Sequence, residues 1–244
     1  MNHQNLLRPL GLVLLSVFII SCAEEPQPEL TVETPDTATT RPEIYADFTL
    51  TADLSHLNDE QRQMIVLLIE ASEIMDDLFW RQSYGDDYKE WLASISDARE
   101  RRFAELNYGP WDALDDEKPF MDGFGPKPLG AQFYPEDMSK EEFETNFLQG
   151  KTDLYTFVRR DTAGELTLVP FHVEYGEELA EAARLLREAA DLSKSPDFAN
   201  YLKLRAAALI SDDFQLSDSY WMDVKDNEID VVIGPIETYL DRLY

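Results

Sequence analysis

The sequence predicts an α+β fold that is mostly helical and contains a small antiparallel sheet. Apolar residues recur at intervals of three and four over several long stretches, which is the period of a helix with one buried face. Residues 154–160 and 166–172 have the composition of strands, and the Gly-containing turn between them predicts a β-hairpin. Residues 228–233 form a third, β-branched run that ends at Gly234, so we expect them to belong to the same sheet.

The first long helix is expected to begin near Asn58, with Asp59 and Glu60 in its first turn. Its buried stripe consists of apolar residues at helical spacing: Met64, Leu67, Leu68, Ala71, Met75, Leu78 and Phe79. Gly85 interrupts this pattern. A second helix is then expected over residues 88–107, packed against the first as a helical hairpin.

Three further helices follow from caps and periodicity. Ser139, with a glutamate three residues later, predicts a capping box and a short helix that ends at Gly150. Residues 177–192 place Leu and Ala on one face, and Ser195 then caps another helix over residues 196–209. We expect the last two helices to pair. No second copy occurs at a matching period, which argues against a repeat protein.

Residues 111–135 predict a long loop that is ordered by packing, because its glycines and prolines are interleaved with aromatic residues. Its glycine spacing is not that of a phosphate-binding loop, since no Lys-Ser or Lys-Thr follows and no strand precedes. Two interpretations remain open. The loop is either a structured binding loop or a cover over the core.

The first 21 residues predict a lipoprotein signal peptide. Arg8 precedes an apolar run of about 11 residues, which is shorter than the roughly 20 needed to span a bilayer. Ser21 leads directly into Cys22, the single cysteine, which is the predicted site of lipidation. The alternative is a plain secretory peptide cut elsewhere. Ala23 favours the outer membrane, so we expect a cell-envelope lipoprotein at the outer membrane or facing the periplasm.

Composition divides the remaining chain into residues 22–42, a predicted disordered acidic tether, and residues 43–244, the predicted folded domain. The net charge of −28 repels nucleic acid and anionic headgroups, so we expect no nucleic-acid partner and membrane attachment only through the Cys22 lipid. Acylation of Cys22 would leave the domain without a thiol. A disulfide, a Cys-zinc site and a Cys nucleophile are therefore excluded.

The histidines do not predict a metal site. The sequence contains only His3, His56 and His172, and His3 would leave with the signal peptide. His56 and His172 are far apart and show no His-Glu-x-x-His spacing. His172 is therefore interpreted as structural. No Gly-x-Ser-x-Gly motif is present either.

Two polar residues follow the turn at Gly234 and Pro235. Glu237 and Tyr239 are two positions apart, so an extended backbone would place both side chains on the same face. A carboxylate and a phenol in this arrangement can hold an amine and polarise a carbonyl. In a chain with 49 acidic residues and 11 tyrosines, such a pair is also typical of a solvated strand edge.

Residues 233–241 resemble the Ile-Gly-Phe-Ile-Glu-Ser-Tyr-x-Asp segment of the dipeptidyl peptidase III family of zinc metallopeptidases. Residues 130–138 and 155–170 resemble the bacterial lipoprotein branch of that family, so the resemblance covers residues 54–244. It implies that the chain is the amino-terminal portion of a larger, two-lobed metallopeptidase fold. The sequence departs from the family pattern at Pro235, where an aromatic residue is usual, and at Arg242, where proline often stands.

The resemblance also implies roles for these residues. Tyr239 would be catalytic, donating a hydrogen bond to the scissile carbonyl oxygen, while Glu237 would bind the free amino end of a peptide substrate. Gly234 is assigned to the same substrate-binding segment.

In the full-length family, zinc is held by a His-Glu-x-x-Gly-His helix and a later Glu, all downstream of this segment. The present sequence contains no such motif. We therefore expect no zinc in this chain and no activity from it alone, and a missing carboxyl-terminal zinc-binding half as its partner. The alternative function is that of a non-enzymatic peptide- or protein-binding lipoprotein.

Overall fold

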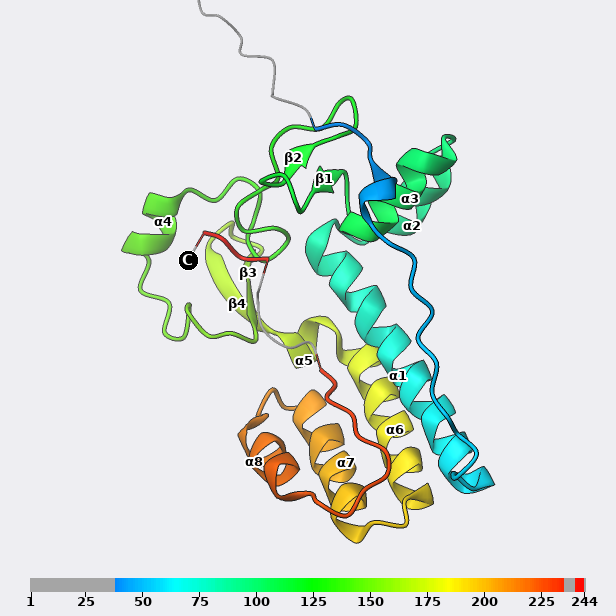
Figure 1. Cartoon of the computed structure of the whole chain (residues 1–244). Coiled ribbons are helices and arrows are strands. Elements are labelled where there is room, and N and C mark those ends of the chain that lie inside the picture. The colour runs from blue at the N-terminus through cyan, green and yellow to red at the C-terminus, as the bar shows by residue number, and fades with distance from the viewer. Residues whose placement is uncertain (1–37, 235–239, 244) are drawn as a thin grey trace, which may run out of the picture. The chain divides into compact units, whose positions relative to one another are not determined.

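The computed structural model describes residues 38–234 and 240–243 and confirms a mostly helical α+β fold (Figure 1). The long helices are α1 (Asp59–Ser83), α6 (Gly176–Leu192) and α7 (Pro196–Leu209). The strands form two separate antiparallel pairs: β1 (Trp111–Asp112) with β2 (Lys118–Pro119), and β3 (Thr156–Arg160) with β4 (Leu166–Pro170). The shorter helices are η1 (Pro42–Ile44), α2 (Tyr88–Ser94), α3 (Ala98–Asn107), α4 (Lys140–Thr145), α5 (Phe171–Glu174) and α8 (Gln215–Asp223).

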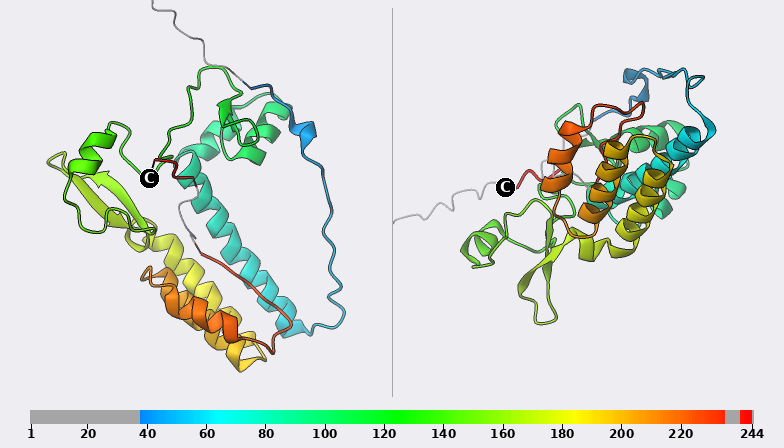
Figure 2. Two further views of the ribbon diagram at one scale, coloured as in Figure 1. Left: turned by 60° about the vertical axis from the view of Figure 1, so that its left-hand side comes forward. Right: turned by 90° about the horizontal axis from the view of Figure 1, so that it is seen from below.

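Helix α1 begins where the sequence predicts. The Asn58 side chain accepts a hydrogen bond from the Gln61 backbone, and the Gln61 side chain accepts one from the Asn58 backbone, which completes a capping box. The predicted stripe is buried at Met64, Leu68 and Leu78. This face packs mainly on α6, and α6 packs in turn on α7 (Figures 1 and 2). The three helices form the main hydrophobic core.

The predicted hairpin between the first two helices is wrong in two respects. The segment 88–107 is split into α2 and α3, because Ile95 adopts an extended backbone and Asp97 caps a new helix, accepting from two backbone N–H groups. Helix α2 meets only the end of α1, where the Trp80 and Tyr88 rings stack with centroids 4.8 Å apart. The long apolar face of α1 is already covered by α6.

The predicted β3–β4 hairpin is confirmed, with Val158 opposite Leu168. Phe157 from β3 and Phe171, at the start of α5, are completely buried, and their ring centroids are 4.7 Å apart. Pro170 ends the second strand and precedes α5, as its missing N–H predicts. The hairpin is thereby joined to the core through aromatic side chains.

Residues 228–233 do not form the predicted third strand. Within the described residues, each sheet contains two strands, and this segment packs against helices instead, with a bend at residues 228–229. Tyr201 on α7 donates to the carbonyl of Val231 at 2.8 Å, and Ile233 is 4% exposed within the main core. Ile233 is buried in this core and Ile229 and Val231 pack against it, whereas Val232 is 56% exposed. The burial of alternate apolar residues by helical side chains explains why the composition resembles that of a strand.

Helix α4 ends at Thr145 rather than at Gly150. Ser139 accepts from the Glu142 backbone, as predicted, but Asn146 adopts an extended backbone. The Lys151 ammonium then donates to the carbonyls of Phe143, Glu144 and Asn146, at 2.5, 3.1 and 2.9 Å. A lysine from beyond the helix therefore satisfies the free carbonyls at its end.

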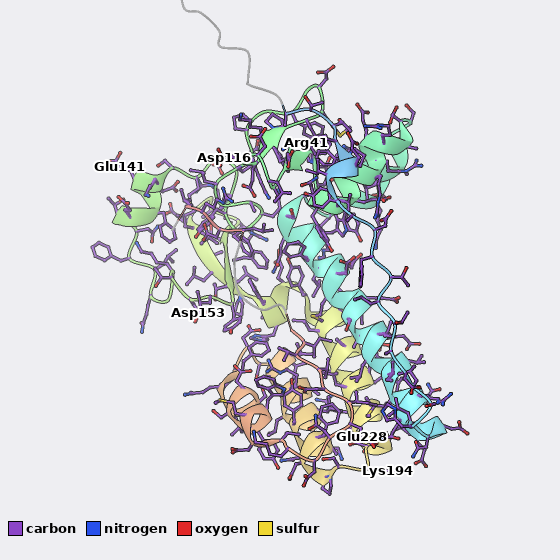
Figure 3. All side chains as sticks on the ribbon, in the orientation of Figure 1. Arg41, Asp116, Glu141, Asp153, Lys194 and Glu228 are labelled. Atoms are coloured by element: carbon purple, nitrogen blue, oxygen red, sulfur yellow. The ribbon has the colours of Figure 1, made fainter. Side chains whose placement is uncertain are left out.

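The last residues of the predicted tether make specific contacts with the fold. Arg41 donates to the buried carboxylate of Asp112 through two nitrogens, at 3.0 and 2.8 Å, and Ala38 donates to the Pro119 carbonyl (Figure 3 labels Arg41). Residues 38–42 therefore belong to the packed part of the chain, a few residues before the predicted boundary at 43. The predicted signal peptide and the rest of the tether lie outside the described residues.

We expect Leu186→Ala to lower the free energy of unfolding by about 2–5 kcal/mol, because Leu186 on α6 is 0% exposed between α1 and α7 and its truncation leaves a cavity. Ile69→Ala, at a position that is 53% exposed on α1, should change it by less than about 0.5 kcal/mol. Urea unfolding of the two variants measures both effects. Equal destabilisation would contradict the assigned core.

Two phenols that contact α1 predict a pH dependence. Tyr88 donates to Asp77 at 2.6 Å and Tyr108 to Asp76 at 2.5 Å. Burial first, and these carboxylates second, raise the pKa of each phenol to about 12. An unfolded phenol titrates at about 10, so this contribution to stability is complete below pH 10 and is lost as the pH rises toward 12.

Phenolate absorbance of the folded protein should therefore include a class of tyrosines that ionises near pH 12, and Tyr88→Phe with Tyr108→Phe should reduce that class. If every tyrosine of the folded protein ionised near pH 10, the burial of these phenols would be contradicted.

Candidate functional site

A short stretch, Gln132–Tyr134, joins three parts of the chain, and we call it the 132–134 strip. Toward α1, the Gln132 backbone N–H donates to the Gln82 carbonyl at 3.1 Å, and the Gln132 side-chain amide donates to the Tyr84 carbonyl at 2.9 Å. Carbonyl groups at the end of a helix have no N–H donor within the helix, and these two bonds supply donors to such groups at the end of α1. The strip is thereby fixed to the longest helix.

Toward the hairpin, the strip lies beside β3. The Val158 backbone N–H donates to the Phe133 carbonyl at 2.9 Å, and Arg159 donates to the Gln132 carbonyl at 3.0 Å. The ring of Phe133, 2% exposed, is stacked on that of Phe157 with centroids 5.4 Å apart. Residues 130–138 and 155–170, which carry part of the family resemblance, therefore lie in direct contact.

Toward the carboxyl end, Tyr134 holds the segment 240–243. Its hydroxyl donates to the Asp241 carboxylate. The Arg242 backbone N–H donates to the Leu129 carbonyl at 2.7 Å. Gly130 permits this arrangement, because a Cβ at that position would lie 2.2 Å from the Tyr134 ring. The third stretch that resembles the family thus reaches the same place as the first two.

An ion-pair network supports this contact. The Glu117 carboxylate lies 3.0 Å from the Lys127 ammonium and 3.6 Å from the Arg242 guanidinium. The Glu117 and Lys127 side chains are only 14% and 7% exposed, so water screens their attraction weakly. Glu117 adopts a left-handed backbone, with φ of +54°, in the turn between β1 and β2. The loop 111–135 therefore helps to hold the segment 240–243.

Of the residues predicted to form the site, the structure describes Gly234, which is partly exposed. Glu237, Tyr239 and Cys22 lie outside the described residues. The chain is held on either side of positions 235–239, by the burial of Ile233 before them and by the Asp241 contact after them. Sequence reasoning missed Tyr134 and Glu117, although the similarity over residues 130–138 pointed to the first of these.

Two cavities border the residues from Gln132 to Pro135. The first has a volume of about 470 Å³ and is lined partly by Leu129, Tyr134, Met138 and Leu243. The second has a volume of about 460 Å³ and contains three guanidinium groups. Each of these is paired with acidic side chains, as Arg81 with Asp86 and Glu178, Arg159 with Glu174, and Arg160 with Asp137 and Glu142. The first cavity is the less charged of the two.

The side chains in the described ranges do not fit a zinc site. His172 has its Nδ1 2.7 Å from the Asp212 carboxylate, which also accepts from the His172 backbone N–H in the first turn of α5, so this histidine is held by a structural contact. Among residues 38–234 and 240–243, no group of three or more His, Cys, Asp or Glu side chains is arranged to hold a metal ion. None of the helices in those ranges is long and apolar enough to cross a membrane.

Comparison with known proteins gives a consistent result. No protein-family model matches the chain. The solved dipeptidyl peptidase III of Caldithrix abyssi is 37% identical, with a TM-score of 0.76, over 82% of this chain and 40% of that chain. The dipeptidyl-peptidase III of Corallococcus sp. strain EGB is 34% identical, with a TM-score of 0.73, over 81% of this chain and 39% of that one. The resemblance to the dipeptidyl peptidase III family is confirmed.

The coverage shows that the chain spans about two fifths of the length of these dipeptidyl peptidase III structures. This agrees with the prediction that it corresponds to a portion of a larger fold. A curated protein, Nudix hydrolase 3 of Arabidopsis thaliana, is 28% identical over 82% of this chain, which covers 34% of that protein.

The contact between Tyr134 and Asp241 can be measured by a double-mutant cycle. We expect Tyr134→Phe and Asp241→Asn, singly and together, to give a coupling energy of about 1.5–3 kcal/mol, because the bond is to a charged acceptor. The exposed pair Tyr220 and Asp197, 3.3 Å apart, should give less than about 0.5 kcal/mol. Urea unfolding supplies the free energies. A coupling no larger at Tyr134 than at Tyr220 would contradict the anchor.

Proposed function

We propose that this chain is the substrate-binding portion of a lipid-anchored, zinc-dependent hydrolase of the dipeptidyl-peptidase type, and that it binds the free amino end of a peptide. The observation that carries the proposal is the convergence of the three family-like stretches on the 132–134 strip. The similarity to two solved dipeptidyl peptidase III structures supports it.

The resemblance to the family implies different roles for Glu237 and Tyr239. The carboxylate of Glu237 would pair with the ammonium group at the amino end of the peptide, a bond that is present before and during reaction. The hydroxyl of Tyr239 would donate to the carbonyl oxygen of the scissile bond as negative charge develops there. The net charge of −28 attracts cationic amino ends and disfavours anionic ligands.

Zinc would activate the attacking water in such an enzyme. Because the described side chains do not fit a zinc site, we assign no step of the reaction to a metal held by them. The ligands would belong to a carboxyl-terminal zinc-binding half. The fact that this chain covers only 40% of a solved dipeptidyl peptidase III chain is consistent with such a further part. That half would be the principal protein partner.

Attachment to the cell envelope is a separate part of the proposal. Lipid on Cys22 would hold the protein at the outer membrane, and the residues after Cys22 would act as the tether. The described folded part begins at Ala38, whose N–H donates to Pro119. About 15 residues would therefore separate the lipid from the fold, enough for a reach of roughly 20 Å.

Binding of a short peptide to this chain tests the proposal without zinc. We expect a tetrapeptide with a free amino end to bind, and its N-acetylated form to bind about 10- to 100-fold more weakly, because a charge-assisted hydrogen bond is lost. Glu237→Gln should abolish this difference. Glu165→Gln, at an exposed position in the turn of the β3–β4 hairpin, is the matched control and should preserve it.

Isothermal titration calorimetry measures the binding of both peptides to the unsubstituted protein and to the two variants. Equal binding of the free and acetylated peptides by the unsubstituted protein would overturn the proposed recognition of the amino end.

A further inference from the structure

Residues 46–53, which we call the 46–53 segment, have the sequence pattern of a half-buried strand, yet every one of them is exposed. The odd positions hold aspartate or threonine, and the even positions hold Ala46, Phe48, Leu50 and Ala52. On an extended backbone this alternation places the four apolar side chains on one face. Phe48 is 83% and Leu50 is 87% exposed, so the described residues leave this apolar face open to solvent.

The position of the segment requires an extended backbone. Figures 1 and 2 show the chain running antiparallel to α1, from the last turn of that helix to its first. Helix α1 has 25 residues, so its length is about 37 Å. The connection 45–58 covers this length with about 14 residues, which would span only about 21 Å as a helix. The segment is therefore held in a strand-like conformation along the helix.

Contacts hold the segment on both sides but not in its middle. The Arg102 guanidinium lies 3.6 Å from the Asp47 carboxylate, and Arg62 donates to the Leu54 carbonyl at 2.8 Å. Over residues 48–52, no backbone N–H or C=O group is hydrogen bonded to any part of the chain that the structure describes. An extended backbone with unpaired donors and acceptors can pair with another strand in the way the edge of a sheet does.

The sequence of the segment is complementary to itself. When two copies pair as antiparallel strands about a two-fold axis at Thr49, Phe48 of each copy lies opposite Leu50 of the other. Asp47 then lies opposite Thr51, so no carboxylates oppose each other. An axis at Leu50 would place Asp47 opposite Asp53 on both sides, which like-charge repulsion disfavours. The axis at Thr49 brings four large apolar side chains together on one face.

The charge of the segment also favours pairing with a second copy. Residues 48–52 contain no charged residue, in a chain that has 49 aspartates and glutamates. Strand edges that avoid pairing usually carry lysine, another charged residue or proline, and residues 48–52 have none of these. The net charge of −28 repels a second copy, but salt screens this repulsion beyond about 8 Å at physiological ionic strength.

We propose that two copies of this chain associate by pairing their 46–53 segments as antiparallel strands about a two-fold axis at Thr49. Because the segment is already extended, it loses little conformational freedom on pairing. About eight residues from each copy take part, compared with about 20–30 in a standard interface, so the dimer is weak and its dissociation constant lies between about 1 μM and 1 mM.

The test uses residues 35–244, which form one compact unit and lack Cys22, the single cysteine. In sedimentation equilibrium between about 10 μM and 1 mM protein, we expect the average mass to rise from that of a monomer toward that of a dimer. Leu50→Asp should raise the dissociation constant at least about tenfold, because a carboxylate would then lie opposite Phe48.

The matched control is Leu216→Asp, which makes the same change on α8 at a residue that is 62% exposed. It should leave the dissociation constant within about twofold of the unsubstituted value, because surface substitutions away from the interface have little effect. Since Leu50 is 87% exposed, both variants should fold normally.

Cysteine substitutions test the register. The two copies of Thr49 would have Cα atoms about 4.5–5.5 Å apart, which suits a disulfide. The two copies of Thr51 would be offset by about 13 Å along the strands, which is too far. On mild oxidation, Thr49→Cys should therefore form a disulfide-linked dimer at least about tenfold faster than Thr51→Cys.

Three results would overturn the proposal. One is a monomer at every concentration, including a monomer in which residues 48–52 are protected from hydrogen exchange, since another part of the same chain would then cover the segment. A second is equal association of the Leu50→Asp and Leu216→Asp variants, which would assign the contact to a different surface. The third is disulfide formation at equal rates by the two cysteine variants.

Discussion

The hydrogen bonds of the 132–134 strip are the constraint on which the other contacts of the site depend. Gln132 is bonded to the end of α1, Phe133 to β3, and Tyr134 to Asp241. These residues come from a stretch with little secondary structure of its own, and their backbone and side-chain groups bond with neighbours on several sides. Without the strip, the described parts of the hairpin and of the segment 240–243 would lose their shared support.

This arrangement explains how the described residues of the segment 228–243 are held in place without pairing with a strand. The bonding of Val231 to Tyr201 and the burial of Ile233 fix the chain before positions 235–239, and the contacts of Asp241 and Arg242 fix it afterwards. Holding both ends reduces the conformational entropy that a ligand would have to offset on binding.

The sequence predicted the elements whose signals are local. The start of α1 at Asn58, the cap at Ser195 and the β3–β4 hairpin are all confirmed, because each depends on residues close together in the chain. Prediction failed where side chains distant in the sequence determine the end of a helix or the packing of its face. Lys151 ends α4 and α6 covers the face of α1 that was expected to meet α2.

The same distinction applies to the candidate site. The family-like pattern identified the segment around Gly234 and Asp241, but no periodicity indicates that Tyr134 reaches across the fold to Asp241, or that Glu117 pairs with Arg242. Helix α8 was also missed, since Ser217 is its only buried residue and its sequence therefore has little helical pattern. Such contacts follow from tertiary packing, which a single sequence specifies only indirectly.

The central claim is that α1, β3 and the segment 240–243 are held together by one set of hydrogen bonds. Native-state hydrogen exchange of three amides tests it most directly: Gln132, bonded to Gln82; Val158, bonded to Phe133; and Arg242, bonded to Leu129. We expect all three to be protected to a similar degree, because they should open in one cooperative unit. Rapid exchange at Arg242, with Gln132 and Val158 still protected, would show that the segment is not part of that unit and would contradict the account.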